Sequence, residues 1–475
     1  MPDHQTKTEL SAKDRARREQ VLSGNMWRVM LSIGTPLALF QAFNMLYRIL
    51  DTMMASHIGS VSVSAVAYLG QIQLMISALG GGLAVGASIK ISEAYGAGNY
   101  KMVKRRVSTL VVLCALLSGL VLLLIPFVPQ LLRITGTPQE FMADGVPYFV
   151  VSLVDIVAVF FNSVYIAIER ARGNSRRILY LNLISILVKL GTTAYFVYVM
   201  QGNITTIAVA SLLSDLVIFV AGLCILLRPG SVFSFSPRAV RFGGEVAGPM
   251  LKMSFPVIVE KVAFQFGKVV INSMATGYGA TTVGALGISN NLGGITTSPQ
   301  NGYQEGGASV ISQNLGAGNV PRAVDAFKKL LVINLVVGVG GAGLTVLFLP
   351  QLSGLFAVND EPFRQLICSI YLYEAIGSAT LGVCAAVTGM LYGFGYTRLT
   401  LLINIFRVFV FRIPVLWALQ NFTQLGSQSV GIVMMVSNVA VSAMSAVVAA
   451  IVLRKICVQH GISFWKTEKR GKTPC

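Results

Sequence analysis

The sequence of 475 residues has few charged residues, and this shortage excludes an ordinary soluble domain. Asp, Glu, Lys and Arg make up 12% of the chain, whereas a soluble globular domain has about 25%. Hydrophobic residues make up 54%. Runs such as 110–128, 204–227, 330–349 and 430–453 approach or exceed the roughly 20 apolar residues that cross a bilayer. The chain is therefore predicted to be an all-α polytopic membrane protein.

The sequence also lacks the patterns that enzymes and metal sites require. Its six cysteines form no Cys-x-x-Cys pair, and the three histidines, His4, His57 and His460, are too scattered to hold a metal. Neither Gly-x-Ser-x-Gly nor His-Glu-x-x-His occurs. Gly-Lys-Thr at 471–473 resembles the end of a phosphate loop, but Lys466 stands where the first glycine belongs. We expect no enzyme, no metal site and no cofactor.

Positive charge is abundant, with a net charge of +18, but the Lys and Arg residues alternate with apolar runs instead of clustering as a nucleic-acid binder requires. The predicted spans are 28–56, 64–94, 107–128, 147–168, 178–200, 204–227, 254–278, 283–313, 328–350, 366–394, 399–420 and 429–453. One side of this scheme collects most of the basic residues outside the spans, and the other side holds Arg133 and Arg364 only. Both termini are therefore predicted to be cytoplasmic, without a signal peptide or a nucleic-acid partner.

An internal duplication is indicated by residues that recur at a fixed spacing. Gly-Ala-Gly-Asn at 96–99 recurs at 316–319, an offset of 220 residues (316 − 96), and Asn182 matches Asn404 at an offset of 222. Six spans is an even number, so both halves enter the membrane from the same side. This parallel repeat predicts twelve transmembrane helices in two six-helix lobes, related by a pseudo-two-fold axis along the membrane normal.

The domain organisation follows from this duplication. We predict a cytoplasmic N-terminal tail, an N-lobe, a cytoplasmic linker, a C-lobe and a basic cytoplasmic tail, at residues 1–27, 28–227, 228–252, 253–453 and 454–475.

Glycines are predicted to interrupt corresponding helices in the two halves. Gly82 and Gly86 fall in the second span, and Gly302 and Gly306 fall in the eighth. Paired interruptions of this kind are typical of a transport site. The alternative is that small residues only let neighbouring helices approach closely.

Motifs in both halves resemble the multidrug and toxic compound extrusion (MATE) family of transporters, bacterial type. They are Leu-Asp-Thr-Met at 50–53, Ser-Phe-Pro at 254–256, Gln-Asn-Leu-Gly-Ala-Gly at 313–318 and Arg-Ile-Pro at 412–414. The resemblance covers roughly residues 28–455. It implies a V-shaped pair of lobes in the bacterial inner membrane, a monomer among lipids, whose rocking exports drugs, toxins or a natural product in exchange for protons or sodium ions.

Asp51 is the strongest candidate for ion coupling. A carboxylate at mid-membrane costs about 2.5–3.5 kcal/mol on insertion scales, so it calls for a partner or a function. Asp51 could alternate between a protonated form and an anion that binds a cation. The alternative is a structural ion pair with Arg48, three residues earlier on the same helical face.

The resemblance implies further coupling positions at Asn182 and Thr193 in the fifth helix and at Ser211 in the sixth. Where the family usually has Asn and then Asp four residues later, this chain has Lys189 and Thr193. The missing acid weakens the case for sodium. Lys189 could replace a bound cation or act as a charge partner of Asp51, so the coupling ion stays open between H⁺ and Na⁺.

A substrate cavity for a small molecule is predicted around Glu260, Lys268, Tyr47, Phe43 and Phe264. Charges and aromatic rings at these positions suit amphipathic compounds. The alternatives are salt bridges between the charged groups and ordinary packing of the rings.

Other ionisable residues in the spans are left open. The sequence does not show which way four further acids face, namely Asp155, Asp215, Glu305 and Glu374. Arg407 and Arg412 are expected to be structural ions or to extend their charged ends toward the membrane surface. Two rival functions also stay open, a flippase for lipid-linked precursors and a membrane receptor or scaffold that does not transport.

Overall fold

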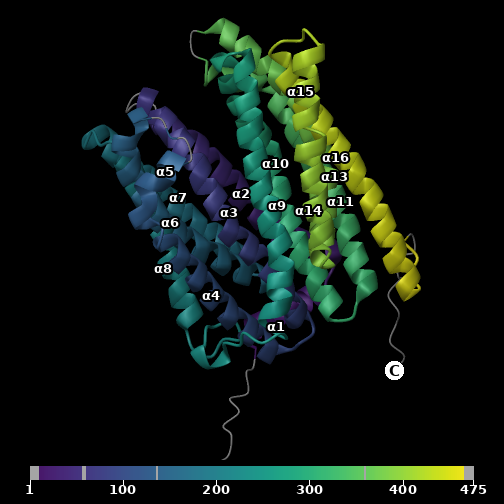
Figure 1. Ribbon diagram of the computed structural model, residues 1–475. Helices are drawn as coiled ribbons and strands as arrows, with labels where there is room; N and C mark the ends of the chain where they lie inside the picture. The colour runs from purple at the N-terminus through teal and green to yellow at the C-terminus, as the bar shows by residue number, and fades with distance from the viewer. Residues whose placement is uncertain (1–9, 56–59, 135–136, 138, 358–359, 465–475) are drawn as a thin grey trace, which may run out of the picture. The chain divides into compact units, whose positions relative to one another are not determined.

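The chain folds into long α-helices (Figure 1). The computed structural model describes residues 10–55, 60–134, 137, 139–357 and 360–464, and within them the side chains other than those of 48–49, 51–55, 60–65, 67 and 140. This part of the chain contains helices and turns but no strand. The predicted all-α class is confirmed.

Each of the twelve predicted spans coincides with a long helix or with consecutive helical segments. They are α2 (Met26–Ala55), α3 (Ser60–Gly96), α4 (Tyr100–Leu122), α6 (Gln139–Ala171), α7 (Ser175–Ala194) with η2 (Tyr195–Val199), α8 (Ile204–Leu227), α9 (Ala247–Ala275), α10 (Ala280–Gly316), α11 (Val320–Leu347), α13 (Glu361–Gly393), α14 (Thr397–Ile405) with η5 (Phe406–Val410) and α15 (Ile413–Phe422), and α16 (Gln428–His460). Ten of the helices in the described residues are long and apolar enough to cross a membrane. The others, α9 and α10, have 29 and 37 residues but carry more charged or small polar side chains.

Short helices lie outside the spans. They are α1 (Ala12–Ser23), before the first span, and η1 (Ile125–Phe127), α5 (Val128–Ile134), η3 (Pro237–Ala239), η4 (Thr276–Tyr278) and α12 (Leu349–Gly354), between later spans. Of these, α5 and α12 occupy corresponding places in the two repeats, between the third and fourth long helices of each half. The repeat therefore extends to the connections between helices.

The helices pack into two compact units, each with its own core. Unit 1 comprises Met1–Arg17, Leu39–Tyr95 and Asn99–Val269, and unit 2 comprises Arg18–Ala38, Gly96–Gly98 and Val270–Cys475. Fully buried Tyr95, Phe149 and Phe160 fill the core of unit 1, and Tyr371 is buried in unit 2. The duplication assigns the seventh span to the second half, whereas α9 as far as Val269 packs within unit 1.

The two Gly-Ala-Gly-Asn turns have the same geometry. Gly98 and Gly318 have φ of +73° and +76°, a left-handed conformation that glycine adopts without steric cost. The next residues, Asn99 and Asn319, donate their backbone N–H to the carbonyl five residues earlier, at 3.0 and 2.9 Å. Their side chains accept from the backbone N–H three residues on, at 3.0 and 3.1 Å, and so cap α4 and α11.

The glycines predicted to interrupt helices do not interrupt them. Gly82 and Gly86 lie within the continuous helix α3, and Gly302 and Gly306 lie within the continuous helix α10. The prediction that these glycines break the helices is therefore wrong. Glycine can adopt helical backbone dihedral angles, so its presence does not by itself end a helix. The alternative of close helix packing accounts for all four positions, and a role in a transport site stays a prediction.

The same close approach between helix backbones occurs at two positions related by the internal duplication. A Cβ on Gly82 would lie 2.7 Å from Cα of Ile258 in α9, and a Cβ on Gly302 would lie 2.5 Å from Cα of Ala38 in α2. Both members of the second pair are related to the first by the offset of 220. Only glycine lets the backbones approach so closely.

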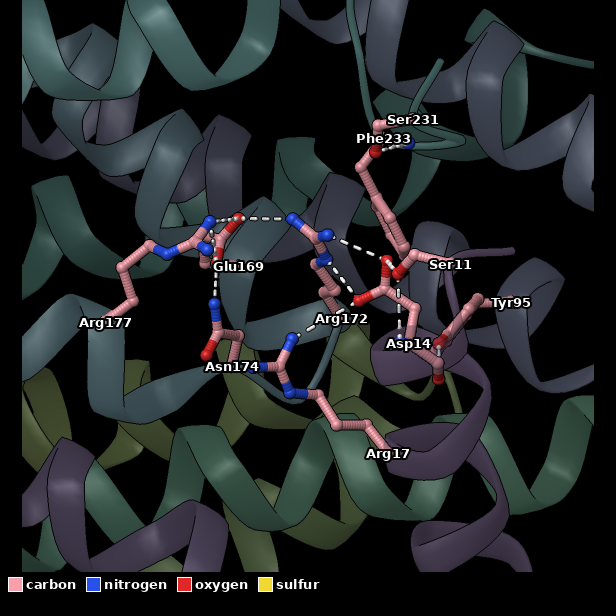
Figure 2. A network of polar contacts seen from close by, with 10 residues as sticks. All are labelled: Ser11, Asp14, Arg17, Tyr95, Glu169, Arg172, Asn174, Arg177, Ser231 and Phe233. Atoms are coloured by element: carbon pink, nitrogen blue, oxygen red, sulfur yellow. Dashed lines mark hydrogen bonds and ion pairs between the residues drawn. The ribbon is translucent and has the colours of Figure 1, made fainter. Parts of the chain in front are cut away.

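The hydrophilic segment before the first span contains helix α1, which the sequence did not predict. Asp14 in its first turn is buried (Figure 2). Arg172, which follows α6, donates from Nε and Nη2 to the two carboxylate oxygens of Asp14 at 2.6 and 2.7 Å. Tyr95 donates its hydroxyl to the Asp14 carbonyl at 2.8 Å. A bidentate ion pair therefore binds the first turn of α1 to the residue that follows α6.

Glu169 supports Arg172 from its other side (Figure 2). Its Oε1 accepts from Arg172 Nη1 at 3.2 Å, and its Oε2 accepts from Asn174 Nδ2 at 2.6 Å. Burial raises the pKa of Asp14, but hydrogen bonds from Arg172 and Ser11 and the charge of Arg172 outweigh burial, so the pKa lies below its ordinary value of 3.8. Burial likewise lowers the pKa of Arg172, and the carboxylates of Asp14 and Glu169 raise it by more.

Candidate ion-coupling site

The predicted coupling residue Asp51 lies within α2, as does its predicted partner Arg48. Both side chains fall outside the described residues. The role of Asp51 and its pairing with Arg48 therefore stay predictions.

Amide side chains hold two acids on different helices of unit 1. Gln73 on α3 donates from Nε2 to Asp155 Oδ2 on α6 at 3.1 Å, and Asn162 on α6 donates from Nδ2 to Asp215 Oδ1 on α8 at 3.1 Å. Each carboxyl group therefore has an uncharged hydrogen-bond donor on one of its oxygens.

The two acids differ in their exposure. Asp155 is 3% exposed, whereas Asp215 is only partly buried. Among the described residues, Asp155 Oδ1 finds no hydrogen-bond partner.

Lys189 on α7 brings a positive charge to the same cluster. Its side chain is buried, and its Nζ lies 4.4 Å from the centroid of the Tyr47 ring, a cation–π distance. The charge of Lys189 acts on Asp215. The structure therefore places this predicted charge partner beside an acid on α8.

The other predicted coupling residues lie on the same two helices. Asn182 and Thr193 share the buried face of α7 with Lys189, seven residues before it and four after it. Asn182 Nδ2 and Thr193 Oγ1 are buried and find no hydrogen-bond partner in the described part of the chain. Ser211, one turn before Asp215 on α8, donates to the carbonyl of Ile207 at 3.1 Å. Coupling roles for these three residues stay predictions.

The residues predicted for a substrate cavity lie on α2 and α9. Glu260 is buried, and Lys268 Nζ lies 5.1 Å from the centroid of the Phe264 ring on the preceding turn. Phe43 and Tyr47 are partly buried on α2. Ring packing thus accounts for part of the pattern, and substrate binding by these residues stays a prediction.

An apolar pocket of about 630 Å³ lies elsewhere, among α11, α13 and α16 of unit 2. Leu331, Val387 and Leu453 are typical of its walls, and Arg454 stands at its edge. None of the predicted cavity residues lines it. It is a pocket on apolar helix faces, distinct from the charged cluster of unit 1.

Unit 2 contains a polar cluster with the opposite balance of charge. Arg407 Nη2 and Arg412 Nη2 both donate to Asn438 Oδ1, at 2.8 and 3.1 Å, and Arg412 Nε donates to Ser437 Oγ at 3.1 Å. Glu374 on α13 supplies a negative charge that acts on both arginines. These groups form a buried structural network, as expected for the two arginines.

The sequence did not predict the partners of Asp155 and Asp215. Both acids lie on helices whose facing the sequence left open. The free-energy cost of burying an acid in an apolar span could have indicated that each needs a partner, as Gln73 and Asn162 provide.

Long apolar helices in two repeated halves, with ionisable residues buried among them, define a multi-pass membrane protein of the transporter class. A family model, MatE, matches residues 36–195 and 256–418, one stretch in each half. The chain belongs to the MatE family, whose members are transporters of small molecules and not enzymes.

Relatives with similar sequences span most of the chain. The chain is 22% identical over 415 residues to the probable multidrug resistance protein YoeA of Bacillus subtilis, which covers 84% of this chain and 88% of that protein. It is 21% identical over 407 residues to the probable multidrug resistance protein NorM of Thermotoga maritima, with 84% and 86% covered.

Solved structures share the fold. A MOP superfamily transporter from Pyrococcus furiosus matches with a TM-score of 0.88 at 20% identity, over 94% of this chain and 99% of that chain. An outward-facing multidrug resistance MATE transporter matches with a TM-score of 0.87 at 19% identity over the same shares. The predicted two-lobe helical fold is therefore confirmed.

Proposed function

We propose that the chain is a secondary active antiporter that exports amphipathic drugs, toxins or a natural product in exchange for protons or sodium ions. The observation that carries this proposal is a cluster of ionisable side chains buried within the spans of a MatE-family chain. The names of two relatives, probable multidrug resistance proteins, support drugs as one substrate class.

Buried charges inside a bilayer favour ion coupling over a passive role. Each charged group costs several kcal/mol in hydrocarbon, so a cluster persists when its members have partners or a function. An ion that binds one conformation more tightly than another shifts the equilibrium between them. In a parallel-repeat transporter, that shift is the rocking of the lobes, which exposes the substrate site to alternate sides.

The proposed setting is the bacterial inner membrane, with both termini in the cytoplasm and the chain acting as a monomer. The asymmetry of basic residues supports this orientation, because Arg133 and Arg364 are the only Lys or Arg residues expected on the outer side. The apolar spans support the multi-pass location.

Asp51→Asn tests the predicted coupling residue. In proteoliposomes with an imposed pH or sodium gradient, we expect gradient-driven efflux of a cationic amphiphile such as ethidium to fall at least about 10-fold. Folding and membrane insertion should stay intact, because Asn has nearly the same shape. The matched control is Asp144→Asn, which removes an exposed acid. Full activity in Asp51→Asn would remove this residue from the mechanism.

The rival functions have separate outcomes in the same liposomes. Flipping of a lipid-linked precursor without ethidium transport would favour the flippase, although the packing of Lys189 against Tyr47 argues against an open basic cavity at that position. Absence of counterflow for every compound in a cationic and zwitterionic panel would favour a receptor or scaffold.

A further inference from the structure

We propose that the apolar pocket of unit 2 binds one acyl chain of an anionic phospholipid, whose phosphate group contacts Arg454 at the edge of the pocket. The pocket lies among α11, α13 and α16 and has a volume of about 630 Å³. This inference depends on the multi-pass membrane location of the chain and not on the proposed antiport. The lipid is a bound ligand of the protein and not its transported substrate.

Three helices line the pocket with apolar faces. Phe327 and Leu331 lie one turn apart on α11, and Val383 and Val387 lie one turn apart on α13. Along α16 and the residue after it, the lining positions run from 446 to 461 at alternating steps of three and one, which places them on one face of the helix. The pocket is therefore an elongated groove between helices.

The groove is open along α16. Ala446 and Ala450, which line it, are small and exposed. Beside them, Val447 and Ile451 are 59% and 64% exposed. In a membrane-spanning helix such apolar side chains face hydrocarbon, and a polar ligand in the groove would lose its hydrogen bonds to water. The chemistry of the groove therefore fits a hydrocarbon chain.

Arg454 lies at the depth of a phospholipid headgroup. The apolar run of α16 ends at Leu453, and Arg454 and Lys455 follow. From Ala446 to Arg454 the helix rises about 12 Å, at about 1.5 Å per residue. The hydrocarbon of one leaflet is about 15 Å thick, half of about 30 Å. An acyl chain that extends from Arg454 toward Ala446 therefore occupies most of the depth of one leaflet, which is the predicted cytoplasmic leaflet.

Positive charge at this end of the groove has no acid opposite it. The described residues that line the pocket include no acid. Arg454 is exposed and makes no ion pair with a residue that the structure describes. Asp325, the one acid of α11, pairs with Lys329 at 2.7 Å. A guanidinium group binds phosphate oxygens through two hydrogen bonds, so an anionic headgroup complements this edge.

The chain after α16 borders the same end of the groove. Gly461 has φ of +62°, and Ile462 donates its backbone N–H to the Cys457 carbonyl at 2.9 Å. This turn brings Ile462 and Phe464 to the pocket. Lys328 on α11 donates from Nζ to the Phe464 carbonyl and lies 4.6 Å from the centroid of its ring. The rim is therefore held by its own contacts, with a second positive charge beside it.

Lipid binding to the delipidated full chain in detergent tests the charged edge. Native mass spectrometry compares phosphatidylglycerol with phosphatidylcholine of the same acyl chains. We expect the wild type to bind phosphatidylglycerol at least about fivefold more tightly, as one basic residue near an anionic headgroup allows. Arg454→Gln should reduce this preference below about twofold. Lys455→Gln, at an exposed neighbour outside the pocket, should keep it. No preference in the wild type, or equal losses in both variants, overturns the inference.

Ala450→Phe tests the apolar part of the site. The larger side chain fills the groove, so both lipids should bind at least about fivefold more weakly. Ile451→Phe, which changes an exposed residue beside the groove, should bind like the wild type. Thermal unfolding without lipid confirms that each variant is folded, and the exposed Arg454→Gln does not depend on repacking. Unchanged lipid binding in folded Ala450→Phe overturns the acyl-chain site.

Other occupants of the groove give different results. Glycerol 3-phosphate, an anion without acyl chains, should not raise the melting temperature at concentrations where phosphatidylglycerol does. Equal stabilisation by glycerol 3-phosphate, displacement of the lipid by ethidium, or a dimer that Ala450→Phe dissociates would each overturn the lipid assignment. The proposed function fails separately, since a chain without ethidium efflux or counterflow still binds lipid here.

Discussion

The two repeats share their packing but bury different charges. Gly82 of the first repeat packs on Ile258 of the second, and Gly302 of the second repeat packs on Ala38 of the first in the same way. The polar groups diverge, since amide side chains bind Asp155 and Asp215 in unit 1 whereas Arg407 and Arg412 both donate to Asn438 in unit 2. Duplication therefore preserved backbone contacts, which tolerate little change, and left the buried charges free to specialise.

Corresponding positions make this divergence concrete. At the offset of 222, Asp215 corresponds to Ser437 (437 − 215) and Asp155 corresponds to Gly377 (377 − 155). Ser437 accepts a hydrogen bond from Arg412, so unit 2 has a hydroxyl group bound to a cation where unit 1 has the carboxyl group of Asp215. Neither of these two positions in unit 2 carries a carboxyl group.

The largest expected effect tests the shared packing. Gly82→Ala and Gly302→Ala each place a Cβ within 2.7 Å of backbone in the neighbouring helix, so each should destabilise by about 3 kcal/mol. Thermal unfolding in detergent measures the loss. Gly119→Ala, where a Cβ meets nothing within 4 Å, is the control and should be neutral or slightly stabilising. A large loss in one repeat and none in the other would break the equivalence.

A smaller effect tests a contact found in the first repeat. Asp14→Asn removes the negative charge to which Arg172 donates two hydrogen bonds. At the offset of 222, Arg172 corresponds to the apolar Phe394, so the second repeat has no matching ion pair at this position. We expect a loss of about 2 kcal/mol near pH 7, measured by thermal unfolding. Glu361→Gln, which breaks the exposed pair with Arg364, is the control and should cost less than about 0.5 kcal/mol.

The pH dependence of the Asp14 effect has a definite sign. Because the folded pKa of Asp14 lies below its ordinary value of 3.8, its stabilisation is fully present above that value and is lost as pH falls through the folded pKa. The stability difference between wild type and Asp14→Asn should be constant from about pH 5 to 8 and should narrow below about pH 4. A difference that persists undiminished at acid pH would contradict the ion pair.

The smallest expected effect tests the matched turns. Asn99→Ala and Asn319→Ala each remove a helix cap and should each cost about 1 kcal/mol. Asn99→Ser and Asn319→Ser keep a capping oxygen and should retain most of the stability. Unequal losses in thermal unfolding, beyond about 0.5 kcal/mol, would show that the two turns are not equivalent.

The sequence predicted the helices better than the polar contacts. Apolar length set the spans, and the recurrence of Gly-Ala-Gly-Asn indicated the duplication, but the helix caps made by Asn99 and Asn319 came from the structure. The prediction from the glycines in α3 and α10 was wrong, because glycine can either interrupt a helix or allow close helix packing, and the sequence does not distinguish the two. Helix α1 was missed, since its hydrophilic sequence becomes ordered through Asp14 and a partner far along the chain, Arg172.

Taken alone, the sequence determined the class of protein, the number of long helices and the duplication, because hydrophobic length and repeated turns are local properties of the chain. Only the tertiary structure decided which buried polar groups meet. Asn162 and Asp215 form a hydrogen bond through the rotation and register of α6 and α8, which depend on packing summed over many neighbours. No local pattern encodes that sum.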